Sequence, residues 1–281
     1  MSMSSAGGKE KQKPQKKSEA SDSILAEILP VIHEKLETVG KYFVFLGELF
    51  RCMVRRPFRI AQYFAEIENL GVNSLFIIIL SGGAMGMIIT LQMVVILMDF
   101  HAEIGAGAAV AVAMSREISP IITALMLIAK NGSAMAAELG TMKVTEQIDS
   151  LESMSISSEH YLVLPKVVAS FFVFPLLTLL ANIVASFGSI LVSVSLYNIE
   201  AAGYIDYLFD FLSPRDVFMG LIKSAVMGYF VSTICCFTGL QASMGAKGVG
   251  DGATRAVVTS SVTVLVIDYL LTSIILRFIY I

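Results

Sequence analysis

Four charged side chains lie inside long apolar stretches, where the only chemistry open to them is pairing or ligand binding. A charge at the centre of a bilayer costs about 2.5 kcal/mol or more. We therefore expect these groups, whose charges sum to zero, to face the interior of a helix bundle and to pair, with Lys223 and Asp268 as the favoured couple. Such a group either holds helices together or lines a substrate cavity, and the sequence leaves both interpretations open. The four residues are Arg116, Glu117, Lys223 and Asp268.

A polar, acidic connector at residues 138–156 separates two of these apolar stretches. Its apolar residues Val144, Ile148 and Leu151 recur at the spacing of one helix face, with polar side chains on the remaining surface. This pattern predicts a short amphipathic helix on the water side of a membrane. That helix either lies on the lipid headgroups or is gripped by another protein.

The sequence contains no pattern typical of catalysis or of metal binding. Cys52, Cys235 and Cys236 are not spaced as zinc ligands, and the three histidines are scattered over different segments. The phosphate-binding pattern G-x-x-x-x-G-K-[ST] is absent. We therefore expect no enzymatic activity and no cofactor in this chain. If the protein uses ATP, another chain must bind it.

The elements that position these residues are five apolar stretches, each long enough to cross a bilayer as a helix. Hydrophobic residues make up 56% of the chain and charged residues only 15%. Crossing the hydrocarbon core takes about 20 residues at about 1.5 Å per residue. The sequence thus predicts an all-α, polytopic membrane protein with five transmembrane helices. The stretches are 72–98, 104–129, 167–199, 217–246 and 256–276.

The distribution of Lys and Arg predicts how these helices are oriented. More than half of these residues lie within 1–71, whereas the loops 99–103 and 198–214 contain none. The connections 130–166 and 241–255 are again basic. By the positive-inside rule the N-terminus is cytoplasmic, and five spans place the C-terminus on the opposite side.

The part of the chain before the first span divides into two segments. Residues 1–22 are rich in Ser, Lys, Gln and Gly without an apolar run, which predicts a disordered basic tail. In 23–71 we expect an amphipathic helix lying in the membrane interface, followed by a basic elbow at Arg55, Arg56 and Arg59. Residues 72–281 then form the membrane domain.

Small residues spaced four apart predict where helices pack closely. Gly82 and Gly86 form such a pair in the first span. Gly132, Ala136 and Gly140 continue the pattern at the end of the second.

Several of these motifs together resemble the MlaE/YrbE-type permeases, the membrane subunits of MCE-associated ABC lipid transporters. The resemblance covers about 72–277, and we therefore take 72–281 as an MlaE-type permease domain. Lys130 departs from the family pattern, which usually has Arg, and Asn131 replaces a small apolar residue. The motifs are Arg116-Glu-Ile-Ser-Pro120, Gly132-Ser-Ala134, Glu138-Leu-Gly-Thr-Met142 and Val144-Thr-Glu-Gln147-Ile-Asp149.

The resemblance implies a lipid transporter of the bacterial inner membrane that assembles from several chains. Two permease copies would form a homodimer around a cavity for phospholipid or a related lipid, with Arg116 and Glu117 as cavity candidates. Two copies of an ABC ATPase would carry ATP and Mg, and a hexameric MCE-domain protein would bridge toward the outer membrane. No nucleic acid is expected. The implied coupling residues toward the ATPase are Glu138, Thr141, Lys143, Thr145, Glu146, Gln147 and Asp149.

Two other classes of membrane protein are weighed against this interpretation. An ion-coupled secondary transporter also buries charges near the midplane, but it usually shows internal repeats, and none is evident between 72–160 and 161–276. A non-transporting membrane scaffold has no need of an acidic coupling helix.

Overall fold

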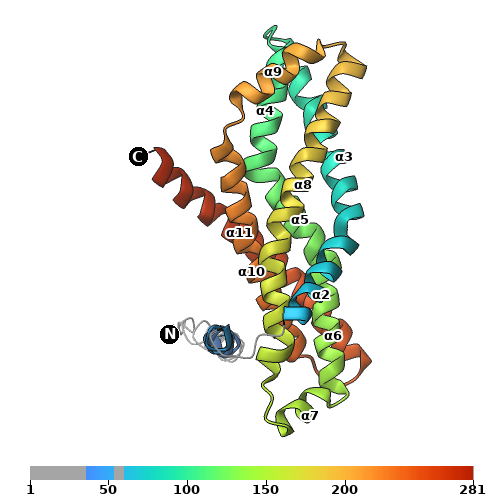
Figure 1. Ribbon diagram of the computed structural model, residues 1–281, viewed down its shortest axis with the longest axis vertical. Helices are drawn as coiled ribbons and strands as arrows, with labels where there is room; N and C mark the ends of the chain where they lie inside the picture. The colour runs from blue at the N-terminus through green and yellow to red at the C-terminus, as the bar shows by residue number, and fades with distance from the viewer. Residues whose placement is uncertain (1–35, 54–59, 281) are drawn as a thin grey trace, which may run out of the picture. The chain divides into compact units, whose positions relative to one another are not determined.

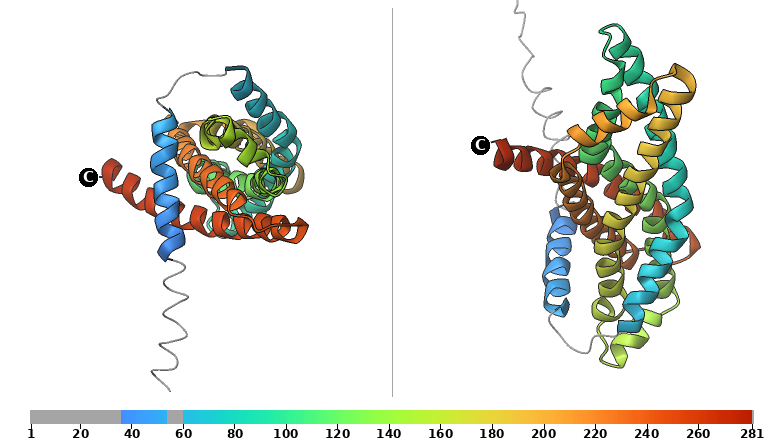
Figure 2. Two further views of the ribbon diagram at one scale, coloured as in Figure 1. Left: turned by 90° about the horizontal axis from the view of Figure 1, so that it is seen from below. Right: turned by 45° about the horizontal axis from the view of Figure 1, so that its top comes forward.

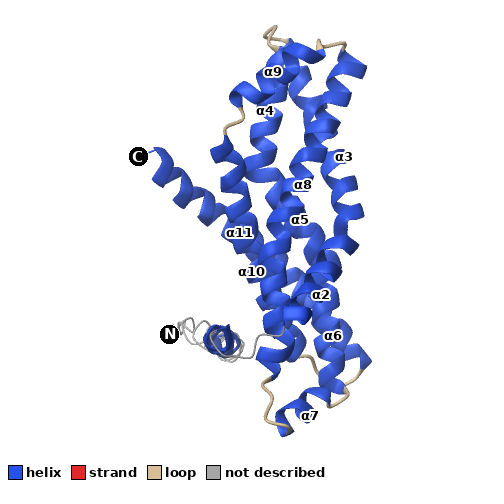
Figure 3. Ribbon diagram, in the orientation of Figure 1, coloured by secondary structure: helices blue, strands red, loops and turns tan. Residues whose placement is uncertain are grey.

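The computed structural model describes residues 36–53 and 60–280, and every regular element in this part of the chain is a helix (Figure 3). Residues 36–53 are helical, as expected for the later part of the predicted amphipathic helix. The predicted tail at 1–22 and the basic elbow lie outside the described residues. The chain divides into two compact units, Met1–Gly47 and Glu48–Ile281.

The prediction of an all-α protein with five membrane-length helices is confirmed. The second of these spans is 42 residues long, roughly 63 Å of helix, which is about twice the thickness of the hydrocarbon core. It is therefore longer than a helix needs to be to cross the hydrocarbon core. The five spans are Ile60–Met98, Glu103–Val144, Glu159–Tyr197, Pro214–Leu240 and Ala246–Arg277.

Several spans consist of helical pieces that follow one another without a loop. Wide π-helical turns divide the second span at Met114–Ile118 and Ile128–Gly132, and Pro120 follows the first of them. A further π-helical turn, Glu159–Val163, opens the third span. The α-helices are α2 (Ile60–Gly71), α3 (Leu75–Met98), α4 (Ala106–Ala113), α5 (Ser119–Leu127), α6 (Ser133–Val144), α7 (Gln147–Ser153), α8 (Leu164–Tyr197), α9 (Ala201–Phe211), α10 (Pro214–Leu240) and α11 (Ala246–Tyr280).

Within the larger unit, α8 is the central helix of the bundle. It packs along α3 on one side and along α10 on another, and α10 in turn packs on α6 and α11. The short helices α7 and α9 lie at opposite ends of the bundle (Figure 1). The C-terminal part of α11 leans away from the other helices of this unit (Figures 1 and 2).

The predicted small-residue stripes lie at close helix contacts. A Cβ atom added at Gly82 would come within 3.2 Å of the Ala181 backbone on α8, and Gly86 touches the Ala185 backbone. At the other stripe, a Cβ added at Gly239 would lie 2.7 Å from the Ala136 carbonyl oxygen. Glycine and alanine at these positions let α3 approach α8 and let α6 approach α10.

A buried chain of hydroxyl groups fixes α9 to the end of the bundle. Thr90 Oγ1 donates to Ser189 Oγ at 2.7 Å, and Ser189 Oγ lies 2.5 Å from the Tyr204 hydroxyl. The Tyr204 ring packs against Gly107, where an added Cβ would approach the ring to 2.7 Å. In a membrane these hydroxyls have no water to bind, so satisfying one another stabilises the junction of α3, α8 and α9.

Candidate functional site

Lys223 is the centre of the intramembrane charge cluster. Its side chain is 1% exposed, and its Nζ lies 2.7 Å from Asp268 Oδ1 and 2.8 Å from Thr272 Oγ1. The expected pair between Lys223 and Asp268 is therefore present. The same Nζ also contacts Glu117 Oε2, so a single ammonium group bridges two carboxylates from α11 and from the π-helical turn.

Arg116 pairs outside the expected set, with Asp216 at the start of α10. Its Nη2 and its Nε both lie 2.8 Å from Asp216 Oδ1. The other oxygen, Oδ2, accepts from the Ser213 N–H at 3.2 Å and so caps α10. Asp216 was not predicted from the sequence. A signal was available, because a serine with an acidic residue three positions later, here Ser213 and Asp216, is typical of a helix start. The cluster thus contains two cations and three carboxylates.

The π-helical turn Met114–Ile118 presents Arg116 and Glu117 to these partners. Pro120 has no N–H to offer the carbonyl four residues earlier, and Lys223 Nζ lies 3.1 Å from that oxygen, Arg116 O. On the neighbouring helix, Gly220 lets the α10 backbone touch the carbonyl of Ser115. The turn, the proline and the glycine together build the polar end of the site.

A cavity of about 700 Å³ lies beside this turn. Small side chains of α4 and two aromatic rings of α9, Tyr207 and Phe211, form its apolar walls. Arg116 and Glu117 are the charged residues among its described lining. A space of this size is typical of ligand sites. An apolar wall next to the two charged side chains Arg116 and Glu117 suits a molecule with an apolar body and a polar group.

The acidic connector is shorter than the sequence predicts, because α6 continues through Val144. The chain then turns at Glu146, which has a left-handed φ of 59°, and α7 follows as a seven-residue helix. Ile148 is buried as the inner residue of α7. The expected helix between the second and third spans is present, but Val144 belongs to the preceding helix, since a left-handed residue interrupts the regular helical hydrogen bonds.

The implied coupling residues are divided among α6, the turn and α7. Lys143 Nζ donates to the Leu240 carbonyl oxygen at 2.6 Å and so holds the end of α10. Glu138 pairs with Lys166, away from α7. The structure therefore does not bring all seven side chains onto one surface. The five exposed near the turn are Thr141, Thr145, Glu146, Gln147 and Asp149.

A second ion-pair network, centred on a buried lysine, joins the base of the bundle. The Lys166 side chain is 4% exposed, and its Nζ lies 3.0 Å from Glu66 Oε1 and 2.8 Å from Glu138 Oε2. These three residues come from α8, α2 and α6. In the sequence, Lys166 is simply the last basic residue of the connection 130–166. No local pattern there predicts that its side chain is buried between two carboxylates.

Asn131, one of the departures from the family pattern, also holds helices together. It is buried, and its Nδ2 donates to the Leu70 carbonyl at 3.2 Å and to Ser74 Oγ at 3.0 Å. The neighbouring Lys130 contacts the Asn73 carbonyl. Both residues therefore hold the second span, just before α6, against the early part of the first span.

The cysteines and histidines of the described segments do not form a metal centre. No group of three His, Cys, Asp or Glu side chains suited to a metal ion occurs among residues 36–53 and 60–277. Cys235 and Cys236 are buried, and Cys235 Sγ lies 3.3 Å from Ser260 Oγ of α11. These cysteines contribute to the packing of α10.

Comparison with known proteins gives a consistent result over most of the chain. The family described as Permease MlaE matches residues 63–274. A probable ABC transporter permease protein of Rickettsia bellii (strain RML369-C) is 34% identical over 236 residues, which are 84% of this chain and 91% of the relative.

Two further relatives have names that specify a transport system or an organelle. The intermembrane phospholipid transport system permease protein MlaE of Haemophilus influenzae is 34% identical over 231 residues, 80% of this chain and 88% of the relative. Protein TRIGALACTOSYLDIACYLGLYCEROL 1, chloroplastic, of Arabidopsis thaliana is 38% identical over 208 residues, 74% of this chain and 59% of the relative.

Proposed function

The chain belongs to the MlaE permease family and is a membrane permease subunit, and we propose that it moves phospholipid or a related lipid as part of an ABC transporter. In this proposal the lipid passes between the inner membrane and a periplasmic path toward the outer membrane. A separate ATPase subunit supplies the energy, and the permease itself makes and breaks no covalent bond.

The observation that carries this proposal is the charged cavity beside the π-helical turn. Arg116 lies about 18 Å along the helix from residue 104, close to the middle of a bilayer. Its guanidinium, which Asp216 orients, suits a phosphate oxygen, and the small side chains of α4 leave room for an acyl chain. A lipid headgroup and tail would therefore both find a partner in one space.

A bulky side chain in this cavity is expected to displace the lipid. Ala109 is exposed on the cavity wall and does not belong to the charge cluster. Ala109→Trp should therefore reduce, by about tenfold or more, both the phospholipid retained by the purified complex and its transfer between vesicles. Mass spectrometry of extracted lipid and a fluorescent-lipid transfer assay measure these quantities.

Leu80→Trp, on the exposed face of α3, is the matched control and should leave both values unchanged. Full lipid retention and full transfer by Ala109→Trp would argue against this cavity as the lipid site. Recovery of an ATP-binding subunit with the purified permease separates an ABC transporter from an ion-coupled transporter or a scaffold.

A homodimer is supported by the unusual exposure of α11. Only 17% of the residues in its apolar stretch are buried, against 33% to 56% in the apolar stretches of the other spans. Its exposed side chains include Val258, Val262 and Tyr269, all more than half exposed. A second copy packed on this face would bury it.

Cross-linking through α11 tests this dimer. Val262→Cys is expected to form a disulfide-linked dimer when membranes are oxidised, because this proposal puts the exposed middle of α11 beside the two-fold axis, where a residue meets its own copy. The native Cys52, Cys235 and Cys236 are buried and should react little. Leu80→Cys, on exposed α3, serves as control. Equal cross-linking from both positions would contradict the α11 interface.

The remaining partners follow from the two ends of the bundle. We place α7 in the cytoplasm, where the exposed Glu146 and Asp149 would dock onto an ATPase that binds ATP and Mg. Two ATPase copies would serve the two permeases. The opposite end, covered by α9, would face a hexameric MCE-domain protein in the periplasm. The N-terminus is then cytoplasmic and the C-terminus periplasmic.

A further inference from the structure

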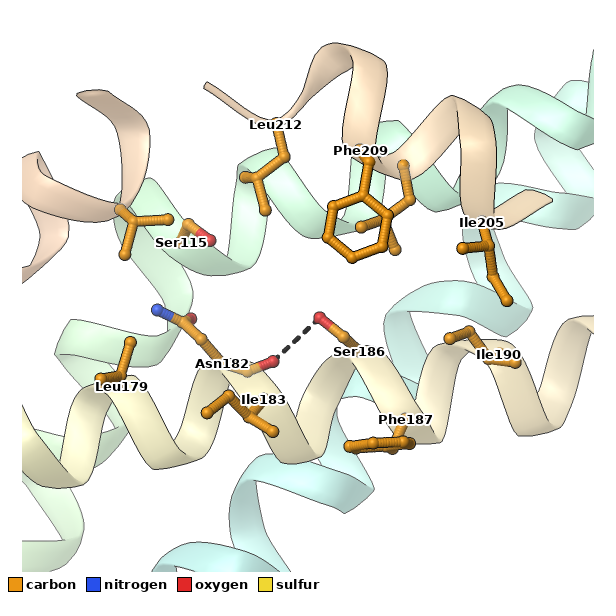
Figure 4. Close-up of a pocket in the computed structure, with 12 residues that line it drawn as sticks. Ser115, Leu179, Asn182, Ile183, Ser186, Phe187, Ile190, Ile205, Phe209 and Leu212 are labelled. Atoms are coloured by element: carbon orange, nitrogen blue, oxygen red, sulfur yellow. Dashed lines mark hydrogen bonds between the residues drawn. The ribbon is translucent and has the colours of Figure 1, made fainter. Parts of the chain in front are cut away.

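A second cavity, of about 390 Å³, lies between α8, α9 and the start of α10 (Figure 4). It shares no lining residue with the charged cavity. Its walls are Leu, Ile, Val and Phe side chains, and its polar lining consists of Ser115, Asn182 and Ser186. Ile183, Phe187 and Phe209 are exposed around it, so it opens sideways toward the surrounding lipid.

Among the residues that line this cavity, Asn182 has an amide whose oxygen and nitrogen are both without a hydrogen-bond partner in the described segments. The residue is 8% exposed, and both its Nδ2 and its Oδ1 lack a partner within the described chain. Figure 4 shows the side chain projecting from α8 into the cavity toward Ser115. Ser186 donates instead to the Asn182 backbone carbonyl at 2.9 Å. Within a bilayer an unpaired buried amide is strongly unfavourable, so a ligand group is the missing partner.

The depth of Asn182 limits what that ligand group can be. It lies about 22 Å along α8 from the helix end at Tyr197, and no charged side chain lines the cavity. A phosphate or ammonium headgroup at this depth would be unpaired and costly. A hydroxyl, by contrast, both donates and accepts, and so it satisfies Oδ1 and Nδ2 together.

The size and walls of the cavity determine the rest of the ligand. A space of about 390 Å³ is at the small end of ligand pockets, enough for one slim apolar body but not for a two-chain phospholipid. We propose that this pocket binds a neutral lipid through a single free hydroxyl held by the Asn182 amide, with one apolar chain along α8 and α9. The proposal requires only that the chain is in a membrane, and it is independent of the transport function.

Photo-labelling of the full-length protein in phosphatidylcholine nanodiscs tests this site. Two diazirine probes present the hydroxyl from different sources, a long-chain alcohol and a diacylglycerol, and the methyl ether of the alcohol is the matched control. The alcohol should label peptides of α8 and α9 about tenfold more than its ether, the ratio expected for hydrogen bonds worth about 1.4 kcal/mol in total. Labelling of the same α8 and α9 peptides by diacylglycerol would also support the proposal, with the second chain lying in the lipid outside the pocket.

Two variants separate recognition by Asn182 from mere access. Asn182→Leu keeps the branched shape of the side chain but cannot form hydrogen bonds, and it should lower alcohol labelling to the level of the ether. Ile183→Trp keeps the amide but obstructs the opening, and it should reduce labelling by both probes. Ser133→Ala removes a hydroxyl that lies outside the pocket and binds the Ala129 carbonyl of its own span, and it should label as the wild type does.

The comparison remains decisive even if Asn182→Leu fails to fold, because the ether and Ile183→Trp test the same site in folded protein. Equal labelling by alcohol and ether in the wild type would overturn the proposal. So would undiminished, alcohol-selective labelling of folded Asn182→Leu, or labelling confined to helices other than α8 and α9.

Discussion

Lys223→Met is expected to remove most of the folded protein from the membrane. Lys223 is 1% exposed and bridges Glu117 and Asp268, so its loss leaves two carboxylates facing each other inside the bundle. Breaking a buried ion pair by removing one partner typically costs about 3–5 kcal/mol. That is a large part of the stability of most domains. Membrane expression and the melting temperature of the purified protein measure the effect.

A second substitution separates lost pairing from lost packing. Lys223→Met combined with Asp268→Asn removes one of the two opposed carboxylates, and Glu117, whose side chain is 38% exposed, can be solvated through the cavity. The double variant should therefore recover much of the wild-type level. Lys247→Met, an exposed lysine at the start of α11, should have little effect. A double variant as depleted as the single one would show that simple pairing is the wrong account.

Reversing charge on the connector is expected to uncouple ATP hydrolysis from lipid transfer. Glu146 and Asp149 are exposed at the end of the second span, and neither participates in the charge cluster. Glu146→Arg with Asp149→Arg reverses the charge of the surface on which the proposed ATPase docks, and each 1.4 kcal/mol of lost attraction or added repulsion weakens docking by about tenfold. We expect lipid transfer to fall at least tenfold while the membrane part stays folded.

Matched variants show whether charge at this place is responsible. Glu146→Gln with Asp149→Asn should give a smaller loss, because it removes attraction without adding repulsion. Glu68→Arg reverses an exposed charge on α2 and should transfer lipid normally. Phosphate release and fluorescent-lipid transfer are measured in the same reconstituted complex. Normal transfer by the double reversal would count strongly against α7 as the coupling element.

The large-scale architecture was predictable because it depends on local quantities. Backbone groups in hydrocarbon must bond within their own helix, so apolar length alone identifies the five spans. The Gly82 and Gly86 pair predicted a close helix contact for a similar reason, since only a missing side chain lets two backbones touch. Pairing of Lys223 with Asp268 followed from the cost of an isolated charge in lipid.

The detailed arrangement of the site was not predictable from local patterns. Which carboxylate meets which cation depends on the rotation and relative height of helices whose paired residues are 28 to 100 positions apart in the sequence. Arg116 could therefore be assigned to the cluster but not to Asp216, and Lys166 could not be placed between Glu66 and Glu138. The left-handed Glu146 that shortens the connector is likewise set by how α6 and α7 pack.

The sequence by itself determined the class of this protein, its five spans, its family resemblance and the residues whose burial needs an explanation. Only the tertiary structure decided how those residues combine into a bridged lysine, a charged cavity and a separate pocket around Asn182. The reason is that hydropathy and helical period act along one chain segment, whereas ion pairs and cavities form between segments. Their geometry exists only once the helices are packed.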